Sequence, residues 1–144
     1  MKLSEKGIII RKTVEADLPQ IYAEGAIEPL LMNLPFRFNA ENLADNFASY
    51  SSICFSAVRK KNVLGFIIGS AEGGVSTVSW MMVKDKFRRA GIGKELLKRF
   101  IDESKKSGTE KFLIALFKNS AESVNFFTDS GFIVNESFIE LQFK

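Results

Sequence analysis

The order of periodic segments in this 144-residue chain predicts an α/β protein of the α+β type. It should have a mixed, mostly antiparallel central sheet of about six or seven strands, flanked by about four helices. Strand-like segments at 52–59, 63–71 and 75–83 follow one another with only short links, which is typical of an antiparallel meander. A helical pattern over 91–107 then joins two strands that no hairpin can join, so those two strands should lie roughly parallel.

The segments before the meander begin with an apolar, β-branched strand at 7–14. A helix should follow over 15–26, because Pro19 would fall in its first turn, where proline is tolerated. Residues 26–37 are apolar but interrupted by two prolines, so we expect a loop or short helix that either covers the core or forms one wall of a pocket. A cap-like asparagine opens a further helix over 39–50.

The second half of the chain continues the alternation of strands and helices. The helix over 91–107 has one apolar stripe, and a glycine should end it. Residues 111–117 form a near-continuous apolar run, the pattern of a strand buried on both faces. A short helix over 120–130 should stop at Gly131, and residues 132–144 should form one or two strands.

Composition narrows the class of protein. Hydrophobic residues make up 46% and charged residues 26%, which is ordinary for one globular domain spanning 1–144. No apolar run approaches the ~20 residues that cross a bilayer, so we expect no membrane segment. The single cysteine, Cys54, excludes an internal disulfide, and no apolar signal core follows the polar start; both favour the cytoplasm.

Several kinds of active site and partner are excluded or disfavoured. The chain has no histidine, which rules out Ser-His-Asp triads, Cys-His pairs and His-ligated zinc. No EF-hand spacing is present, and we predict no metal site. A net charge of +3 from 20 basic and 17 acidic residues argues against nucleic acid as a partner. The basic helix over 91–107 is better explained as a solvated face.

The stretch "FRRAGIGKELL" at 87–97 has the features of an anion site. A helix starts with N–H groups that lack partners, and its dipole makes that end positive. Gly91 and Gly93 let a ligand approach the backbone and let the chain turn sharply. Arg88, Arg89 and Lys94 add positive charge, so the stretch suits a phosphate or pyrophosphate.

Two well-known phosphate loops do not fit this stretch. A Walker loop needs glycine at the position of Arg88 and serine or threonine at that of Glu95. A dinucleotide fingerprint needs a third glycine where Leu96 stands, and the preceding strand opens no βαβ unit at the start of the chain.

Residues 88–93 match the pattern Arg/Gln-x-x-Gly-x-Gly/Ala of the GNAT superfamily of N-acetyltransferases. The flanks at 79–97 resemble that family's strand, loop and signature helix, and residues 8–22 resemble its first strand and helix. Residues 123–133, "SVNFFTDSGFI", are similar to its late helix, which ends in a Gly-Phe pair. The resemblance covers nearly the whole chain in the right order.

This resemblance implies an acyl-CoA N-acyltransferase-like fold with acetyl-CoA as the donor co-substrate. The coenzyme pyrophosphate would sit on backbone amides of 88–94, and its pantetheine arm would pair with the backbone of 81–83. The strand at 113–117 should splay from 75–83 to open a cleft. The coenzyme-contacting residues implied are Met81, Met82, Val83, Arg88, Arg89, Ala90, Gly91, Ile92, Gly93, Lys94, Asn119, Phe126 and Phe127.

The implied reaction is direct attack of an amine on the acetyl carbonyl, which a general base would assist. The signature strand carries no carboxylate, so Glu72, Glu28 or water relayed through backbone carbonyls are the candidates. Many members have a tyrosine, able to protonate the leaving thiolate, where this chain has Phe127. The loss need not be fatal, because a thiol of pKa ~8.5 leaves tolerably as thiolate.

The acceptor cannot be read from the sequence; a polyamine, a drug-like amine, an amino acid and a protein N-terminus all fit. The apolar loop at 26–37 leans toward an acceptor with an apolar part, or could bury itself in a homodimer. The phenylalanine at position 127 and the absence of a carboxylate in the signature strand also fit a non-catalytic acyl-CoA-binding or regulatory domain, which would bind acetyl-CoA without turnover.

Overall fold

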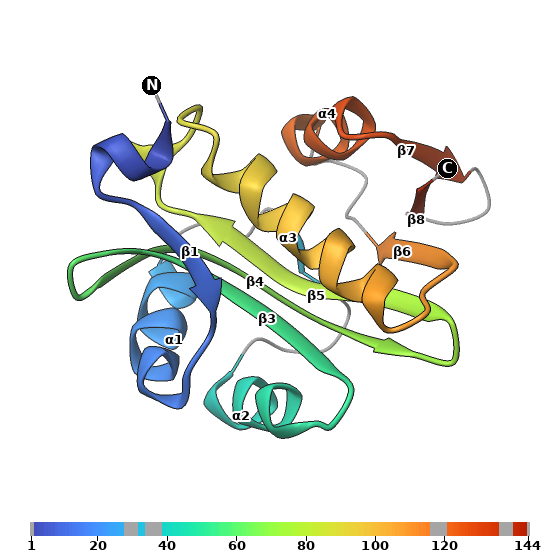
Figure 1. Ribbon diagram of the computed structural model, residues 1–144, viewed down its shortest axis with the longest axis horizontal. Helices are drawn as coiled ribbons and strands as arrows, with labels where there is room; N and C mark the ends of the chain where they lie inside the picture. Colours follow the sequence, from blue (N-terminus) through green and yellow to red (C-terminus); the bar gives the residue numbers. More distant parts are fainter. Residues whose placement is uncertain (1, 28–31, 34–38, 116–120, 136–139, 144) are drawn as a thin grey trace.

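The computed structural model describes residues 2–27, 32–33, 39–115, 121–135 and 140–143. Its strands form one sheet in the order β1-β3-β4-β5-β6-β8-β7, with β2 paired to β5 (Figure 1). The strands are β1 (Ile9–Lys12), β2 (Met32–Asn33), β3 (Ser52–Arg59), β4 (Asn62–Glu72), β5 (Val75–Val83), β6 (Lys111–Ala115), β7 (Phe132–Asn135) and β8 (Glu140–Phe143). The α-helices are α1 (Leu18–Ile27), α2 (Ala40–Ala48), α3 (Ile92–Lys106) and α4 (Ala121–Asp129).

The topology confirms the predicted fold class. Strands β3, β4 and β5 form the antiparallel meander, and β5 pairs parallel with β6 through the crossover helix α3. Within the described residues the sheet has eight strands, against about six or seven expected. The two-residue strand β2 accounts for the difference, since it lies in the segment that we expected to be a loop or short helix; the rest of 28–38 is outside the described residues.

Helices cover both faces of the sheet (Figure 1). The apolar stripe of α3 packs with inward side chains of β3, β4 and β5 in one core cluster. On the opposite face, Ile21 of α1 and Leu43 of α2 pack with Phe66 and Trp80 in a second cluster. Each strand of the meander is therefore buried on both sides, which explains its near-continuous apolar sequence.

Local signals mark the ends of the elements as predicted. Asn39 caps α2, because its side-chain oxygen accepts a hydrogen bond from the Asn42 N–H at 2.8 Å. Gly108, just after α3, and Gly131, just after α4, have φ of +85° and +104°. That left-handed backbone favours glycine.

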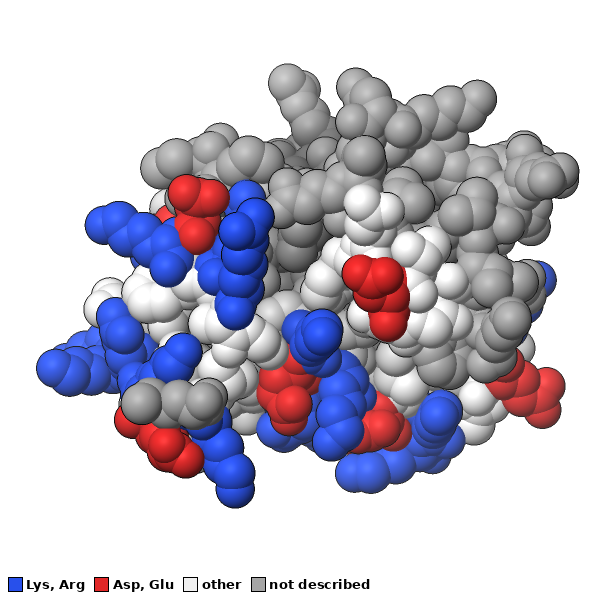
Figure 2. Space-filling view, turned by 90° about the horizontal axis from the view of Figure 1, so that it is seen from above, with Lys and Arg blue, Asp and Glu red and all other residues white. Residues whose placement is uncertain are grey.

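Two arginines occupy the exposed edge of the sheet at β1. Arg99 of α3 donates to the Ile10 carbonyl at 3.1 Å and lies over the Phe55 ring, 5.1 Å from its centroid. Arg11 donates to the Lys12 carbonyl at 3.1 Å. Occupying edge carbonyls in this way hinders pairing with another strand. Arg99 therefore has a structural role. Figure 2 shows that basic side chains are intermixed with acidic ones over the face seen from above.

A buried acid ties the end of β1 to the start of α1. Asp17 is 5% exposed and accepts two hydrogen bonds from Arg11, at 2.7 and 2.9 Å, and one from the Val14 N–H at 3.0 Å. Burial raises the pKa of Asp17, but the hydrogen bonds and the charge of Arg11 outweigh it and leave this pKa below its ordinary value. The carboxylate is thus the form that stabilises the folded chain.

We expect Asp17→Asn to lower the free energy of unfolding by about 2 kcal/mol at pH 7, because a charged hydrogen-bond network is lost. A group whose pKa is lowered by folding stabilises the protein above its unfolded pKa of about 3.9 and loses that contribution as the pH falls further. Urea unfolding at pH 7 and pH 3 checks this: the gap between variant and wild type should shrink at pH 3. An equal gap at both pH values would show that the charge is not the cause.

Among the described residues no helix is long and apolar enough to span a membrane.

Candidate functional site

A bulge interrupts the pairing of β4 with β5 at the middle of β5. Ile68 lies opposite Trp80, whereas the next residue, Gly69, lies opposite Val78. Ser79 therefore has no partner on β4. A bulge of this kind bends its strand and increases the local twist.

Strand β6 stays beside β5 only up to this bulge. The two strands pair from Val75 opposite Lys111 to Val78 opposite Ile114, and no later residue of β6 pairs with β5 in the described part of the chain. Strand β5 itself continues to Val83. Of the segment 113–117 that we expected to splay from β5, Leu113 and Ile114 instead pair with it, and Ala115 alone lies past the last pair in the described residues.

Strand β2 occupies part of the edge that β6 leaves. Met32 lies opposite Met81, and Asn33 lies opposite Trp80. These are the only two pairs between β2 and β5 in the described residues. Strand β2 therefore covers the edge of β5 at Trp80 and Met81, just beyond the bulge, and Val83 lies two residues past the last pair.

The backbone of β5 presents only alternate residues to that edge. The N–H of Lys84 donates to the Leu64 carbonyl at 2.8 Å, so Lys84 faces β4. Since neighbouring residues of a strand face opposite edges, Met82 also faces β4, while Met81 and Val83 face away from it. Our expectation for Met82 was therefore wrong: its backbone pairs within the sheet, as its register with β4 shows, and cannot receive an added strand. Met81 shares its edge with β2.

A sharp turn carries the chain from the end of β5 into α3. A short 3₁₀ turn, η3 (Asp85–Phe87), comes first; then Arg89 and Gly91 take left-handed backbone angles, with φ of +65° and +92°. Gly91 is the N-cap of α3, and its carbonyl accepts the first helical hydrogen bond, from the Glu95 N–H at 3.1 Å. The N–H groups that start α3 therefore have no partner within the helix.

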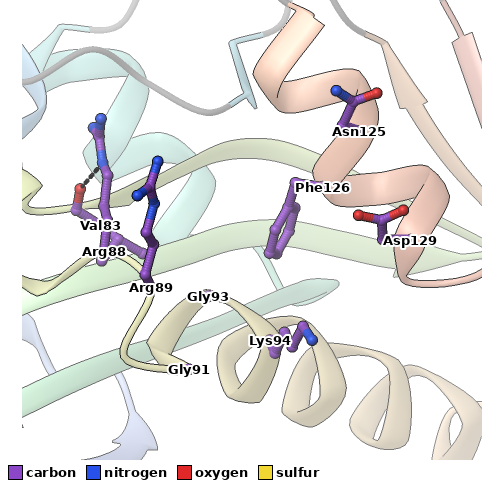
Figure 3. Close-up of a pocket in the computed structure, with 9 residues that line it drawn as sticks. All are labelled: Val83, Arg88, Arg89, Gly91, Gly93, Lys94, Asn125, Phe126 and Asp129. Atoms are coloured by element: carbon purple, nitrogen blue, oxygen red, sulfur yellow. Dashed lines mark hydrogen bonds between the residues drawn. The ribbon is translucent and has the colours of Figure 1, made fainter.

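A cavity of about 520 Å³ opens beside this turn (Figure 3). One wall consists of the end of β5, the turn and the first turn of α3. The other wall is the face of α4. The residues that line the cavity are Val83, Arg88, Arg89, Gly91, Gly93, Lys94, Asn125, Phe126 and Asp129. Eight of these lie in two segments that the sequence singled out, the signature stretch and the late helix, and the fold brings the segments together.

The two arginines of the turn have different surroundings. The Arg88 Nε donates to the Val83 carbonyl at 2.9 Å (Figure 3). The Arg88 guanidinium also lies 3.6 Å from the Asp85 carboxylate. Arg88 thereby fastens the turn to the end of β5 and occupies a carbonyl that we expected the coenzyme arm to use. Arg89 and Lys94 are exposed and line the cavity.

Gly93 allows α4 to approach α3 closely. A Cβ at this position would lie 3.1 Å from the Phe126 ring and 3.7 Å from the Met81 side chain. From the sequence we expected Gly93 to allow the close approach of a ligand. In the structure the glycine also makes room for the Phe126 ring, which lines the cavity on the α4 side.

Phe127 packs in the core. It is fully buried, and its ring contacts Phe126 and Phe132 edge-on, with centroids 5.0 and 5.7 Å apart. Phe126, one residue earlier, is the ring that lines the cavity. Of these two expected contacts, only Phe126 reaches the cavity, because Phe127 is buried in the core.

The structure does not bring Glu72 to the cavity. This carboxylate is exposed at the turn between β4 and β5, where it accepts a hydrogen bond from the Tyr50 hydroxyl. Glu72 pairs with Val75, and Val83 lies eight residues further along β5, which corresponds to about 26 Å. The other two residues expected at the site, Glu28 and Asn119, lie outside the described residues.

The remaining expected contacts differ in exposure. The side chain of Ile92 is buried in the core, whereas Ala90 is half-buried beside the turn. Sequence reasoning missed Asn125 and Asp129. Their spacing of four residues puts both on one face of α4, a signal that was available once the helix was predicted.

Comparisons with known proteins agree with this geometry. A family model described as "Acetyltransferase (GNAT) family" matches residues 18–132, which include the turn, strands β5 and β6, and α4. The chain belongs to the GNAT acetyltransferase family. As a GNAT member it is an N-acetyltransferase of the acyltransferase class, with acetyl-CoA as co-substrate.

Solved structures of GNAT enzymes share this fold. The ribosomal-protein-S18-alanine N-acetyltransferase of Escherichia coli has a TM-score of 0.79 at 18% identity, over 94% of this chain and 92% of that one. The PaiA N-acetyltransferase of Thermoplasma acidophilum, solved with coenzyme A, has a TM-score of 0.75 at 16% identity, over 95% and 98%. Ard1 of Thermoplasma volcanium has a TM-score of 0.76 at 17% identity, over 94% and 95%. A search of curated proteins finds no match.

Proposed function

We propose that residues 1–144 form one acetyltransferase domain that moves an acetyl group from acetyl-CoA to a primary amine of a small molecule or peptide. The observation that carries the proposal is the cavity of Figure 3, where a cationic turn, the start of α3 and the open end of β5 meet. Phosphates suit the turn, because unpartnered N–H groups, the helix dipole and two exposed cations converge there. A cytoplasmic location belongs to the same proposal and is supported by the free, buried thiol of Cys54.

The reaction would be direct attack of the amine on the thioester carbonyl. An amine of pKa near 10.4 must first lose a proton, which costs about 4–5 kcal/mol at pH 7. In the described residues Asp129 is the one carboxylate that lines the cavity, and it lies on the α4 wall, across the cavity from the cationic turn. Water relayed along backbone carbonyls, or a carboxylate outside the described residues such as Glu28, would accept the proton.

The leaving thiolate has no tyrosine to protonate it at position 127. Phe127 has no acidic proton and is buried. A thiol of pKa ~8.5 leaves as thiolate without a general acid, at some cost in rate. Catalysis would then depend mostly on holding the amine and the thioester together, which alone can supply a large part of the rate enhancement.

The experiment is to mix the purified protein with acetyl-CoA and a panel of amines: polyamines, aminoglycosides, amino acids and short peptides with free N-termini. Free thiol release follows turnover, and mass spectrometry identifies the acetylated amine. We expect at least one class of amine to give thiol release in proportion to enzyme concentration. The absence of turnover across the panel would contradict the proposed acceptor.

A second candidate is a domain that binds acyl-CoA without turnover. The specific observations for it are the buried Phe127 and the pairing of β2 on the β5 edge beside Met81. Calorimetry with acetyl-CoA separates the two: tight binding together with no thiol release for any amine would favour this candidate. A homodimer built on the apolar segment 26–37 remains part of the proposal, and light scattering tests it.

A further inference from the structure

The cavity beside α3 has two walls of different chemistry. The wall formed by the turn and α3 presents Arg89, Lys94 and unpartnered N–H groups. The α4 wall presents an amide, an aromatic ring and a carboxylate, from Asn125, Phe126 and Asp129. A ligand made only of phosphates would suit the first wall and be repelled by the carboxylate of the second. The cavity therefore suits a ligand with an anionic part and a part that donates hydrogen bonds.

The α4 wall is built as one surface. Asn125 and Asp129 are separated by one helical turn, and Phe126 lies between them with its ring resting against Gly93. Both polar side chains are exposed, and Figure 3 shows the Asp129 carboxylate on the α4 side of the cavity together with the Phe126 ring. Among the described residues, Asp129 makes no ion pair within 4.0 Å with Arg89 or Lys94. The carboxylate is thus available as an acceptor.

The chemistry of these side chains fits an aminopurine. A carboxylate accepts from an exocyclic amine, an asparagine amide can pair with the amine and the adjacent ring nitrogen of adenine, and an aromatic ring offers a surface for a base. Coenzyme A carries such a base at the end of its phosphates. If the adenine base lies against α4, the phosphates of the same molecule can occupy the cationic turn on the other wall.

We propose that Asn125, Phe126 and Asp129 recognise the adenine base of the coenzyme and that Asp129 accepts a hydrogen bond from its exocyclic amine. This inference rests on the proposed function. It makes Asp129 a specificity-determining residue for the donor, one that distinguishes a nucleotide with a free 6-amino group from one without it.

The test compares coenzyme A with 1,N⁶-ethenocoenzyme A, whose amine is closed into a ring and cannot donate. Calorimetry measures the Kd of both for the wild type, Asp129→Ala and Asp129→Asn. We expect the wild type to bind coenzyme A about tenfold more tightly than the etheno form, on the scale of one charge-assisted hydrogen bond. Asp129→Ala should reduce this ratio severalfold by weakening coenzyme A alone, with any remaining preference due to Asn125, and Asp129→Asn should retain more of it.

Asp102→Ala is the matched control. Asp102 is exposed on α3, ten residues after Ile92 and about 15 Å along the helix, so its removal changes net charge equally without touching the cavity. It should leave the ratio at the wild-type value. Circular dichroism checks that each variant is folded.

Three outcomes would overturn the inference. Tighter binding of coenzyme A by Asp129→Ala would mean that the carboxylate only repels the phosphates. An equal loss of affinity for both nucleotides in Asp129→Ala would mean that the Asp129 carboxylate only stabilises the fold of α4. A wild type that binds neither nucleotide would overturn the proposed function as well, so the two failures are distinguishable.

Discussion

Gly69→Ala is expected to lower the free energy of unfolding by about 3 kcal/mol, the largest effect that we anticipate for a single methyl group. A Cβ at this position would lie 2.2 Å from the Thr77 carbonyl oxygen and 2.7–2.8 Å from the Phe100 ring. The carbonyl belongs to the neighbouring strand and cannot move without breaking the β4–β5 ladder. Gly69 also stands beside the bulge at Ser79, so a displaced β4 should disturb the cavity. Urea unfolding measures the loss.

Two further variants show which contact causes the loss of stability in Gly69→Ala. Gly108→Ala is the control for backbone conformation, because a Cβ there meets nothing within 4 Å and only its φ of +85° opposes the change; it should cost about 1 kcal/mol. Gly69→Ala combined with Phe100→Leu gives the added methyl group more room on the α3 side only. If this double variant recovers the stability of Phe100→Leu alone, the ring rather than the carbonyl is the obstacle, and our explanation is wrong.

Removal of both exposed cations at the turn should weaken coenzyme A binding by about a hundredfold. Arg89 and Lys94 line the cavity beside the start of α3, and each hydrogen bond from a cation to a phosphate contributes roughly 1.5 kcal/mol or more. The Kd from calorimetry should rise accordingly for Arg89→Ala combined with Lys94→Ala. S-acetylpantetheine, which lacks the nucleotide and its phosphates, should be turned over by the double variant as well as by the wild type.

The matched control removes two other exposed cations, Lys61 and Lys111, which do not line the cavity. Lys61→Ala combined with Lys111→Ala gives the same net charge, so it should bind coenzyme A within about twofold of the wild type, since exposed charges at a distance are screened by salt. Equal weakening by both double variants would show a general effect of net charge. The phosphates would then not be held at the turn.

The sequence alone was sufficient for most of the fold, because the signals involved are local. The apolar stripe of α3, the meander and the asparagine cap of α2 each depend on residues within one or two turns of one another, and the structure confirms all of them. The anion-binding character of 88–94 was also local, since glycine, a helix start and positive charge coincide there. Strand β2 was missed because two residues carry no periodicity.

The tertiary structure decided what each residue of the site does. The sequence grouped Arg88 with Arg89, but only the fold shows that Arg88 binds the Val83 carbonyl while Arg89 lines the cavity. Likewise, Phe126 and Phe127 are adjacent in sequence, and the packing of α4 against α3 alone determines which ring reaches the cavity. Glu72, a reasonable base by position in the chain, ends up at the far end of β5.

The physical reason is the range of the interactions. Glycine conformation, helix capping and hydrophobic period are set by neighbours in the chain, so the sequence by itself determined where the turn lies and which groups suited to an anion it carries. The wall opposite the turn comes from a helix about thirty residues later, whose Asn125 and Asp129 acquire a role only when the sheet brings α4 to α3. Long-range packing, which no local pattern encodes, made the predicted anion site one wall of a cavity whose other wall has a different chemistry.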